Sequence, residues 1–230
     1  MRPPIIIALG GSIIVPDKIN TDFLKKFRKL ILKFTRQGKK FIIVAGGGRT
    51  ARLYQNAASK VIKITNEDLD WIGIHATRIN AHLLRTIFFK ESYPIILDNP
   101  YKIVHTRKSV IIASGWRPGW STDYISILLA KRFEAKEAII AGRPPYVYTK
   151  DFLKYRDAKP MKRISWKSYR KIIGSRWIPG MPAPVDPIGA KLAQKMKLKA
   201  IVIQGTNLKN LENLLEGKKF KGTTIESTIE

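Results

Sequence analysis

Short apolar segments alternate along this chain with longer segments of helical periodicity. Each apolar segment is four or five residues long, and they lie at residues 5–9, 41–45, 94–97, 110–113, 138–141 and 200–203. Strands that are apolar throughout are typical of parallel sheets buried on both faces, and parallel neighbours need crossover connections that are usually helical. The alternation therefore predicts an α/β fold, a three-layer αβα sandwich with a mainly parallel central sheet.

Four of the connecting segments have apolar residues at helical spacing. Helices are predicted at residues 21–36, with Thr21 as the N-cap, at 50–58, at about 67–89 and at 124–132. No repeat and no linker-like segment interrupts the 230 residues. We therefore predict one domain, 1–230, with an N-terminal lobe of about 1–135 and a C-terminal lobe of about 136–230.

Composition narrows the class of protein. Hydrophobic residues make up 44% of the chain, which is ordinary for a globular protein and too high for a disordered one. No apolar run reaches the roughly 18 residues of a membrane helix, and the apolar start of the chain is too short for a signal peptide. Cysteine is absent, which excludes disulfides and thiolate metal sites. A cytoplasmic protein with no membrane partner is expected.

The charge of the chain is strongly unbalanced. It has 43 lysines and arginines against 17 acidic residues, a formal net charge of +26, so an anionic partner is expected. The basic residues occur on nearly every predicted helix, not in one stripe, and no zinc finger or RRM signature accompanies them. We favour a basic surface set by the cellular environment or by an anionic small-molecule substrate, and keep nucleic acid as the less favoured partner.

Two glycine clusters directly follow predicted strands. Gly10-Gly11-Ser12 follows the first strand, and Gly46-Gly47-Gly48 follows the second and opens a helix. Ligands of α/β folds bind at the carboxyl ends of strands, where glycine lets the backbone approach a bound group and a helix N-terminus attracts anions. One such cluster would indicate only a tight turn, whereas two at neighbouring strand ends predict phosphate binding. Neither is a P-loop, because no Gly-Lys-Ser/Thr follows.

A third loop, residues 115–123, follows the predicted strand at 110–113 and precedes an apolar helix. Its last three residues, Ser121, Thr122 and Asp123, have two interpretations. In the first interpretation, one of the three residues caps the helix. In the second, their hydroxyl and carboxylate groups face the same crevice as the glycine clusters.

The loops and the segments around them resemble a known family. The resemblance rests on Ala-Leu-Gly-Gly-Ser, Val-Ala-Gly-Gly-Gly-Arg-Thr-Ala-Arg, Asp70-Trp-Ile-Gly-Ile-His-Ala-Thr-Arg-Ile-Asn-Ala and Pro-Gly-Trp-Ser-Thr-Asp, in that order. Their order and spacing are similar to those of the amino acid kinase superfamily, and within it of the archaeal-type uridylate kinases. Later segments extend the resemblance over nearly the whole chain: Tyr148-Thr149-Lys150-Asp151, Asp157-Ala158-Lys159, Asp186-Pro187 with Ala190-Lys191, and Gly222-Thr223-Thr224-Ile225.

The resemblance implies an activity and roles for residues. The activity is transfer of the ATP γ-phosphoryl group to UMP, giving UDP for pyrimidine nucleotide biosynthesis, with Mg²⁺ as cofactor and a homohexamer as the assembly. Asp123 would organise the reacting groups, and Arg52 and Lys191 would supply positive charge. ATP binding is implied for Gly11, Ser12, Gly48, Arg52, Gly142, Tyr148 and Asp151. UMP binding is implied for Gly47, Asp70, Trp116, Arg117, Pro118, Gly119, Trp120, Ser121 and Thr122.

The chain departs from the family pattern on the ATP side. The family usually has Thr-Asn-Val-Asp-Gly-Val-Tyr where this chain has Gly142-Arg143-Pro144-Pro145-Tyr146-Val147-Tyr148. Pro145 removes a carboxylate and a backbone N–H donor. The alternative function is therefore a non-catalytic or altered-specificity member that binds nucleotides or polyanions. Ala8 replaces a lysine of many superfamily members, which the archaeal-type uridylate kinases also lack.

No residue is predicted as a metal ligand. His75 and His82 are seven residues apart and share a face of one predicted helix. Two imidazoles without a neighbouring carboxylate make a poor metal site, so packing or surface roles are expected for both.

Overall fold

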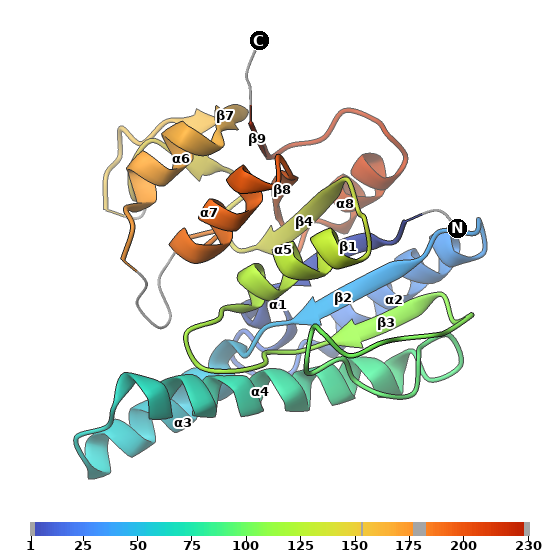
Figure 1. Ribbon diagram of the computed structural model, residues 1–230, viewed down its shortest axis with the longest axis horizontal. Coiled ribbons are helices and arrows are strands. Elements are labelled where there is room, and N and C mark those ends of the chain that lie inside the picture. The colour runs from blue at the N-terminus through green and yellow to red at the C-terminus, as the bar shows by residue number, and fades with distance from the viewer. Residues whose placement is uncertain (1–2, 153, 177–182, 228–230) are drawn as a thin grey trace.

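A seven-stranded sheet runs through the middle of the molecule (Figure 1), and its strand order is β3-β2-β1-β4-β8-β9-β7. The computed structural model describes residues 3–152, 154–176 and 183–227. Every neighbouring pair in the sheet is parallel except β8 and β9. The strands are β1 (Ile5–Leu9), β2 (Phe41–Ala45), β3 (Val110–Ala113), β4 (Glu137–Gly142), β7 (Arg163–Ser165), β8 (Lys199–Gln204) and β9 (Thr223–Glu226). The mainly parallel sheet is as predicted.

Helices cover both faces of this sheet. Alternate residues of each strand point to opposite faces, so Ile6 and Ala8 belong to one buried cluster and Ile7 and Leu9 to the other. The first cluster is covered by α5 (Thr122–Arg132), α6 (Trp166–Ile173) and α7 (Pro187–Lys195). The second is covered by α1 (Gly11–Ile14), α2 (Thr21–Thr35), α4 (Asn66–Ile87) and α8 (Leu208–Leu215), and α3 (Gly48–Val61) packs outside against α4. The predicted three-layer αβα sandwich is confirmed.

Two local predictions are wrong. The N-cap of α2 is Asn20 and not Thr21, because the Asn20 side chain accepts a hydrogen bond from the Phe23 amide at 3.2 Å. Residues 94–97 form no strand. Only isolated bridges join Ser92 to Val110 and Leu97 to Ala113, and Pro94 lies between them without the N–H that a continuous ladder requires.

Elements of the second half of the chain were not predicted. They are the strands β7 and β9, the helices α6, α7 and α8, and a small antiparallel pair, β5 (Val147–Tyr148) with β6 (Pro160–Met161). Most of them are shorter than the window over which periodicity gives a clear pattern.

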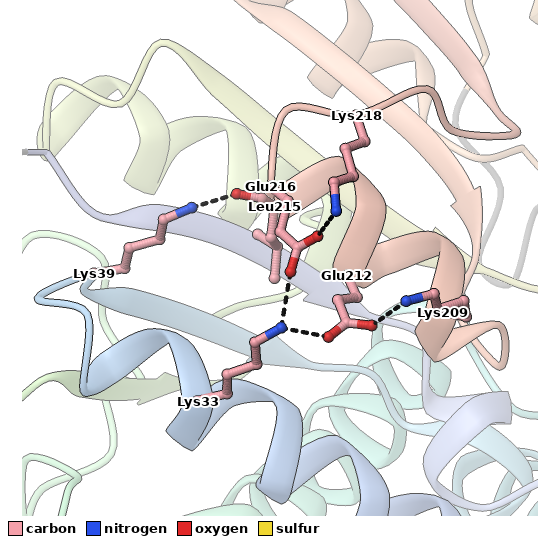
Figure 2. A network of polar contacts seen from close by, with 7 residues as sticks. All are labelled: Lys33, Lys39, Lys209, Glu212, Leu215, Glu216 and Lys218. Carbon is pink, nitrogen blue, oxygen red and sulfur yellow. Dashed lines mark hydrogen bonds and ion pairs between the residues drawn. The ribbon is translucent and has the colours of Figure 1, made fainter.

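An ion-pair network joins α2 to α8 (Figure 2). Lys33 Nζ lies 2.6 Å from Glu212 Oε1 and 2.8 Å from Glu216 Oε1, and Lys209 and Lys218 bind the other carboxylate oxygens. These contacts with Lys218 and Lys33 lower the pKa of Glu216 to about 2. The network thus connects a helix of the first half of the chain to a helix of the second half.

Candidate active site

The two glycine clusters lie against each other, backbone on backbone, where the neighbouring strands β1 and β2 end. A Cβ atom on Gly11 would lie 2.0 Å from the amide nitrogen of Gly48, and one on Gly48 would lie 2.2 Å from the carbonyl oxygen of Gly11. Gly48 also has φ +66°, a left-handed conformation that disfavours side chains. The glycines are therefore required by the contact between the two loops, whether or not a ligand is bound.

A buried side chain of α4 holds the second cluster in place. Asn80 is 4% exposed, and its Nδ2 donates to the carbonyl oxygens of Gly46 at 2.8 Å and Gly47 at 3.1 Å. Both carbonyl oxygens therefore have a hydrogen-bond partner within the protein. Ser12 lies in the first turn of α1, half-buried and with no hydrogen bond within the described ranges.

Positive charge gathers beside the glycine contact. Arg52 lies one turn into α3, is accessible to solvent, and makes no ion pair or hydrogen bond in the part of the chain that the structure describes. Burial of part of its side chain lowers the pKa of Arg52, and the charges of Arg143 and Arg49 lower it further. Asp17 pairs with Arg49 at 2.8 Å and is itself largely exposed. This arrangement suits an anion.

The loop after β3 is fastened to α4 by three hydrogen bonds. Asp70 Oδ2 accepts from the amide of Gly119 at 2.7 Å, and Gly119 has φ +80°. Thr77 Oγ1 accepts from the amide of Gly115 at 2.8 Å, and Arg78 donates to the Trp116 carbonyl at 3.4 Å. Asp70 and the loop at 115–122, both predicted to bind UMP, are thus brought together.

Aromatic side chains and one arginine shape that loop. The guanidinium of Arg117 lies 4.4 Å from the ring centroid of Trp116 and 4.3 Å from that of Trp120, within the range of cation–π contacts. The two indoles meet edge to face at 4.7 Å, and Trp120 continues to Tyr124 at 4.5 Å. Pro118 lies between the two tryptophans in sequence and is half-buried. The loop is therefore stiffened by packing before any ligand arrives.

The end of the loop meets a second carboxylate. Ser121 caps α5, since its Oγ accepts from the amide of Tyr124 at 2.9 Å, and it donates to Asp186 Oδ2. Asp186 is 3% exposed and caps α7 through its Oδ1, which accepts from the amides of Ile188 and Gly189. Thr122 is the first residue of α5.

Asp123 lies in the first turn of α5, next to this contact. Burial raises the pKa of Asp123 well above its usual value, and the nearby carboxylate of Asp186 raises it further. A carboxyl group whose negative charge is disfavoured in the unliganded protein is favoured as an anion when a cation binds beside it. The site therefore suits a cation or a proton at Asp123.

The remaining predicted residues lie in the second half of the chain. Gly142 ends β4, and its carbonyl accepts from the amide of Gly205 at 2.8 Å. Tyr148 lies in β5 and stacks on Phe152 with ring centroids 4.6 Å apart. Asp151 lies 3.9 Å from the ammonium of Lys154. Among the described residues, neither Gly142 nor Tyr148 has a hydrogen bond with the glycine clusters.

Lys191 is the remaining residue that was predicted to supply positive charge. It lies on α7, is exposed, and makes no ion pair or hydrogen bond in the described segments. The basic residues whose charges lower the pKa of Arg52 are Arg143 and Arg49.

Sequence reasoning gave no role to Thr77, Asn80 and Asp186, which position the loops. A signal for the first two was present, because Asp70, Thr77 and Asn80 are polar residues at helical spacing on a face that had to be buried. Asp186 before Pro187 is an N-cap signal, but nothing local to it indicates the contact with Ser121.

The described residues contain no group of three or more His, Cys, Asp or Glu side chains placed to hold a metal ion. His75 and His82 are exposed on α4, and His75 lies 6.3 Å from the ring of Trp71. No helix within the described ranges is long and apolar enough to cross a membrane.

Comparison with known proteins assigns the chain to a family. Residues 3–204 match the sequence profile of the amino acid kinase family. The uridylate kinase of Thermoplasma volcanium is 35% identical over 98% of this chain and 99% of that protein, and the uridylate kinase of Methanococcus vannielii is 34% identical over 96% and 98%. The solved structure of uridylate kinase from Archaeoglobus fulgidus has a TM-score of 0.82 at 28% identity, covering 96% of this chain and 99% of its own. The UMP kinase of Bacillus anthracis, 21% identical with a TM-score of 0.77 over 99% and 98%, has the same fold. The chain therefore belongs to the amino acid kinase family.

Proposed function

We propose that this protein is a nucleoside monophosphate kinase that converts ATP and UMP to ADP and UDP. The curated relatives similar to it over nearly their whole length are uridylate kinases. One observation carries the proposal: Asp70 holds the loop at 115–122 beside the paired glycine clusters, where the unpaired Arg52 lies. A carboxylate, aromatic rings and an arginine beside backbone loops are the groups that a nucleotide requires.

The first half of the chain binds UMP in this proposal. Asp70 accepts hydrogen bonds from ribose hydroxyls while it keeps the amide of Gly119, because a carboxylate has about four acceptor positions. The loop from Trp116 to Thr122 encloses the base. Gly47 and Arg52 receive the phosphate, the latter through a planar fork that matches phosphate oxygens.

ATP binds to residues of both halves. Its phosphates lie along the glycine clusters of the first half, at Gly11, Ser12 and Gly48, and its adenosine lies near Gly142, Tyr148 and Asp151 of the second half. The two halves correspond to lobes of about 1–135 and 136–230. In the sheet, β2 and β3 lie on one side of β1 and β4 and β8 on the other, so the substrates meet where β1 ends.

The reaction needs positioning and charge more than proton removal. The UMP phosphate has a second pKa of about 6, so it is mostly a dianion at neutral pH and needs no general base. Arg52 neutralises charge on the transferring group, and Lys191 adds further positive charge. Asp123 keeps these cations aligned and does not act as a general base.

Mg²⁺ suits the site beside Asp123. Asp186 already accepts hydrogen bonds from Ser121 and from two amides, so the carboxylate of Asp123 would be the protein ligand to Mg²⁺, and phosphate oxygens would supply the further hard donors that Mg²⁺ prefers. When bound, Mg²⁺ neutralises charge on the phosphates. In the cell we place this activity in cytoplasmic pyrimidine nucleotide synthesis, with a homohexamer as the assembly.

A coupled assay of ADP release tests the function. The acceptors are UMP, CMP, dUMP, isopentenyl phosphate and acetylglutamate, each with ATP and Mg²⁺, and EDTA serves as the control. UMP should give the highest kcat/KM and EDTA should abolish release. A protein whose ADP formation and melting temperature do not respond to millimolar UMP is not a uridylate kinase.

A further inference from the structure

Arg143 is an exposed arginine that directly follows β4. It makes no ion pair or hydrogen bond within the part of the chain described here. Its backbone is well anchored, because the amide of Gly10 donates to the carbonyl of Ala141 at 2.9 Å and the amide of Gly205 donates to that of Gly142 at 2.8 Å. A fixed backbone thus carries an unpartnered guanidinium at the carboxyl edge of the sheet.

The strand order places this guanidinium on one particular side of the crevice. β4 pairs with β1 on the side opposite to β2, so Arg143 and Arg52 approach the end of β1 from opposite sides. Arg143 is near enough for its charge to lower the pKa of Arg52. The helix that carries Asp70, α4, packs on β2 and β3, on the side of β1 away from β4.

The local charge balance is incomplete without an anion. Among the described residues, the acidic side chain whose charge acts on Arg52 is Asp17, and Asp17 is already paired with Arg49. Two guanidinium groups held near each other repel, and a phosphate chain between them would remove that repulsion and add charge-assisted hydrogen bonds.

The two prolines after Arg143 make its position more definite. Pro144 and Pro145 fix their own φ angles and disfavour the helical conformation of the residue before each of them. They also donate no N–H groups to a ligand. Because Pro144 and Pro145 offer no backbone donors, the guanidinium of Arg143 is the group of this segment best suited to bind phosphate.

We propose that Arg143 binds the polyphosphate of the phosphoryl donor, opposite Arg52. This inference rests on the proposed function for the identity of the donor, ATP. It names a phosphate-binding residue on the donor side, one that would compensate for the donors absent at Pro145.

The test compares binding of ADP and of adenosine by calorimetry in the wild-type protein and in Arg143→Ala. Loss of a charge-assisted contact should weaken ADP binding by about 10-fold to 100-fold and leave adenosine binding unchanged. The ADP affinity of Arg143→Lys should lie between those of the wild type and Arg143→Ala, because lysine keeps the charge and loses the planar fork. In turnover, KM for ATP should rise in Arg143→Ala while KM for UMP does not.

Arg107→Ala is the matched control. Arg107 is also an exposed arginine, but it precedes β3 and so lies at the opposite edge of the sheet. Loss of the Arg107 side chain should change neither the affinity for ADP nor the affinity for adenosine. Unchanged ADP affinity in Arg143→Ala, equal losses for ADP and adenosine, or a rise confined to KM for UMP would each overturn the inference. If the wild type shows no UMP-dependent turnover, the proposed function fails, and ADP affinity still decides the role of Arg143.

Discussion

Replacement of Gly48 by alanine should destabilise the protein strongly, because two separate costs coincide there. A side chain at φ +66° costs about 1–2 kcal/mol. Its Cβ would lie 2.2 Å from the carbonyl oxygen of Gly11, and backbone can relieve such overpacking only by moving, at a further cost of about 1–3 kcal/mol. The sum, about 2–5 kcal/mol, lowers Tm by about 4–20 °C in a chain of this size.

Gly38→Ala separates the two costs. Gly38 has φ +80° and a Cβ added there would have no atom within 4 Å, so only the conformational cost applies and Tm should fall by about 2–8 °C. In Gly11→Ala only the steric cost applies, because Gly11 does not have a left-handed backbone and its Cβ would lie 2.0 Å from the amide nitrogen of Gly48.

Thermal unfolding by circular dichroism measures all three variants. Gly48→Ala should melt several degrees below Gly38→Ala. If the two variants melt within about 2 °C of each other, the glycine clusters are not in close contact and the loop geometry described above is wrong.

Three further predictions concern charge. Asp123→Asn should raise Tm at pH 7, because burial raises the pKa of Asp123 and the wild type therefore loses stability as the pH rises toward that pKa. In a series of Tm measurements, the difference in Tm between the variant and the wild type should vanish near pH 3. The kcat of Asp123→Asn should fall about 100-fold. Lys33→Ala should lower Tm at pH 7 by an amount that shrinks as the pH falls through the pKa of Glu216, about 2. Binding of a fluorescent oligonucleotide should disappear near 150 mM salt, where the Debye length is about 8 Å; submicromolar affinity there would favour the polyanion-binding alternative.

Much of the first half of the fold could be predicted from the sequence. The strands β1, β2 and β3 are apolar throughout because both faces are buried, and that pattern needs no partner to be recognised. The glycine clusters were also recognised, but their mutual contact was not, because periodicity does not show which loops meet. Residues 94–97 were also misjudged from the local pattern, because a short apolar run predicts a strand and the proline at its start interrupts the pairing.

The second half was less predictable for a physical reason. β7 and β9 have three and four residues and pair only with each other and with β8. Their structure depends on long-range pairing that no local pattern encodes. The site residues divide in the same way, into those that the sequence reveals and those that depend on long-range contacts. Asp70 and Asp123 were found through a resemblance, whereas the contact of Asp186 with Ser121 joins residues 65 apart in the chain.

The ion-pair network between α2 and α8 also has a consequence for the order of folding during synthesis. Lys33 and Glu212 are 179 residues apart, and the buried cluster around them includes Phe34 and Leu211. At about 5–20 residues per second, the ribosome makes α8 roughly 10–35 s after α2. During that interval the apolar side of α2 that α8 will cover stays open to solvent, so a nascent chain stalled before residue 208 should be the form that chaperones bind.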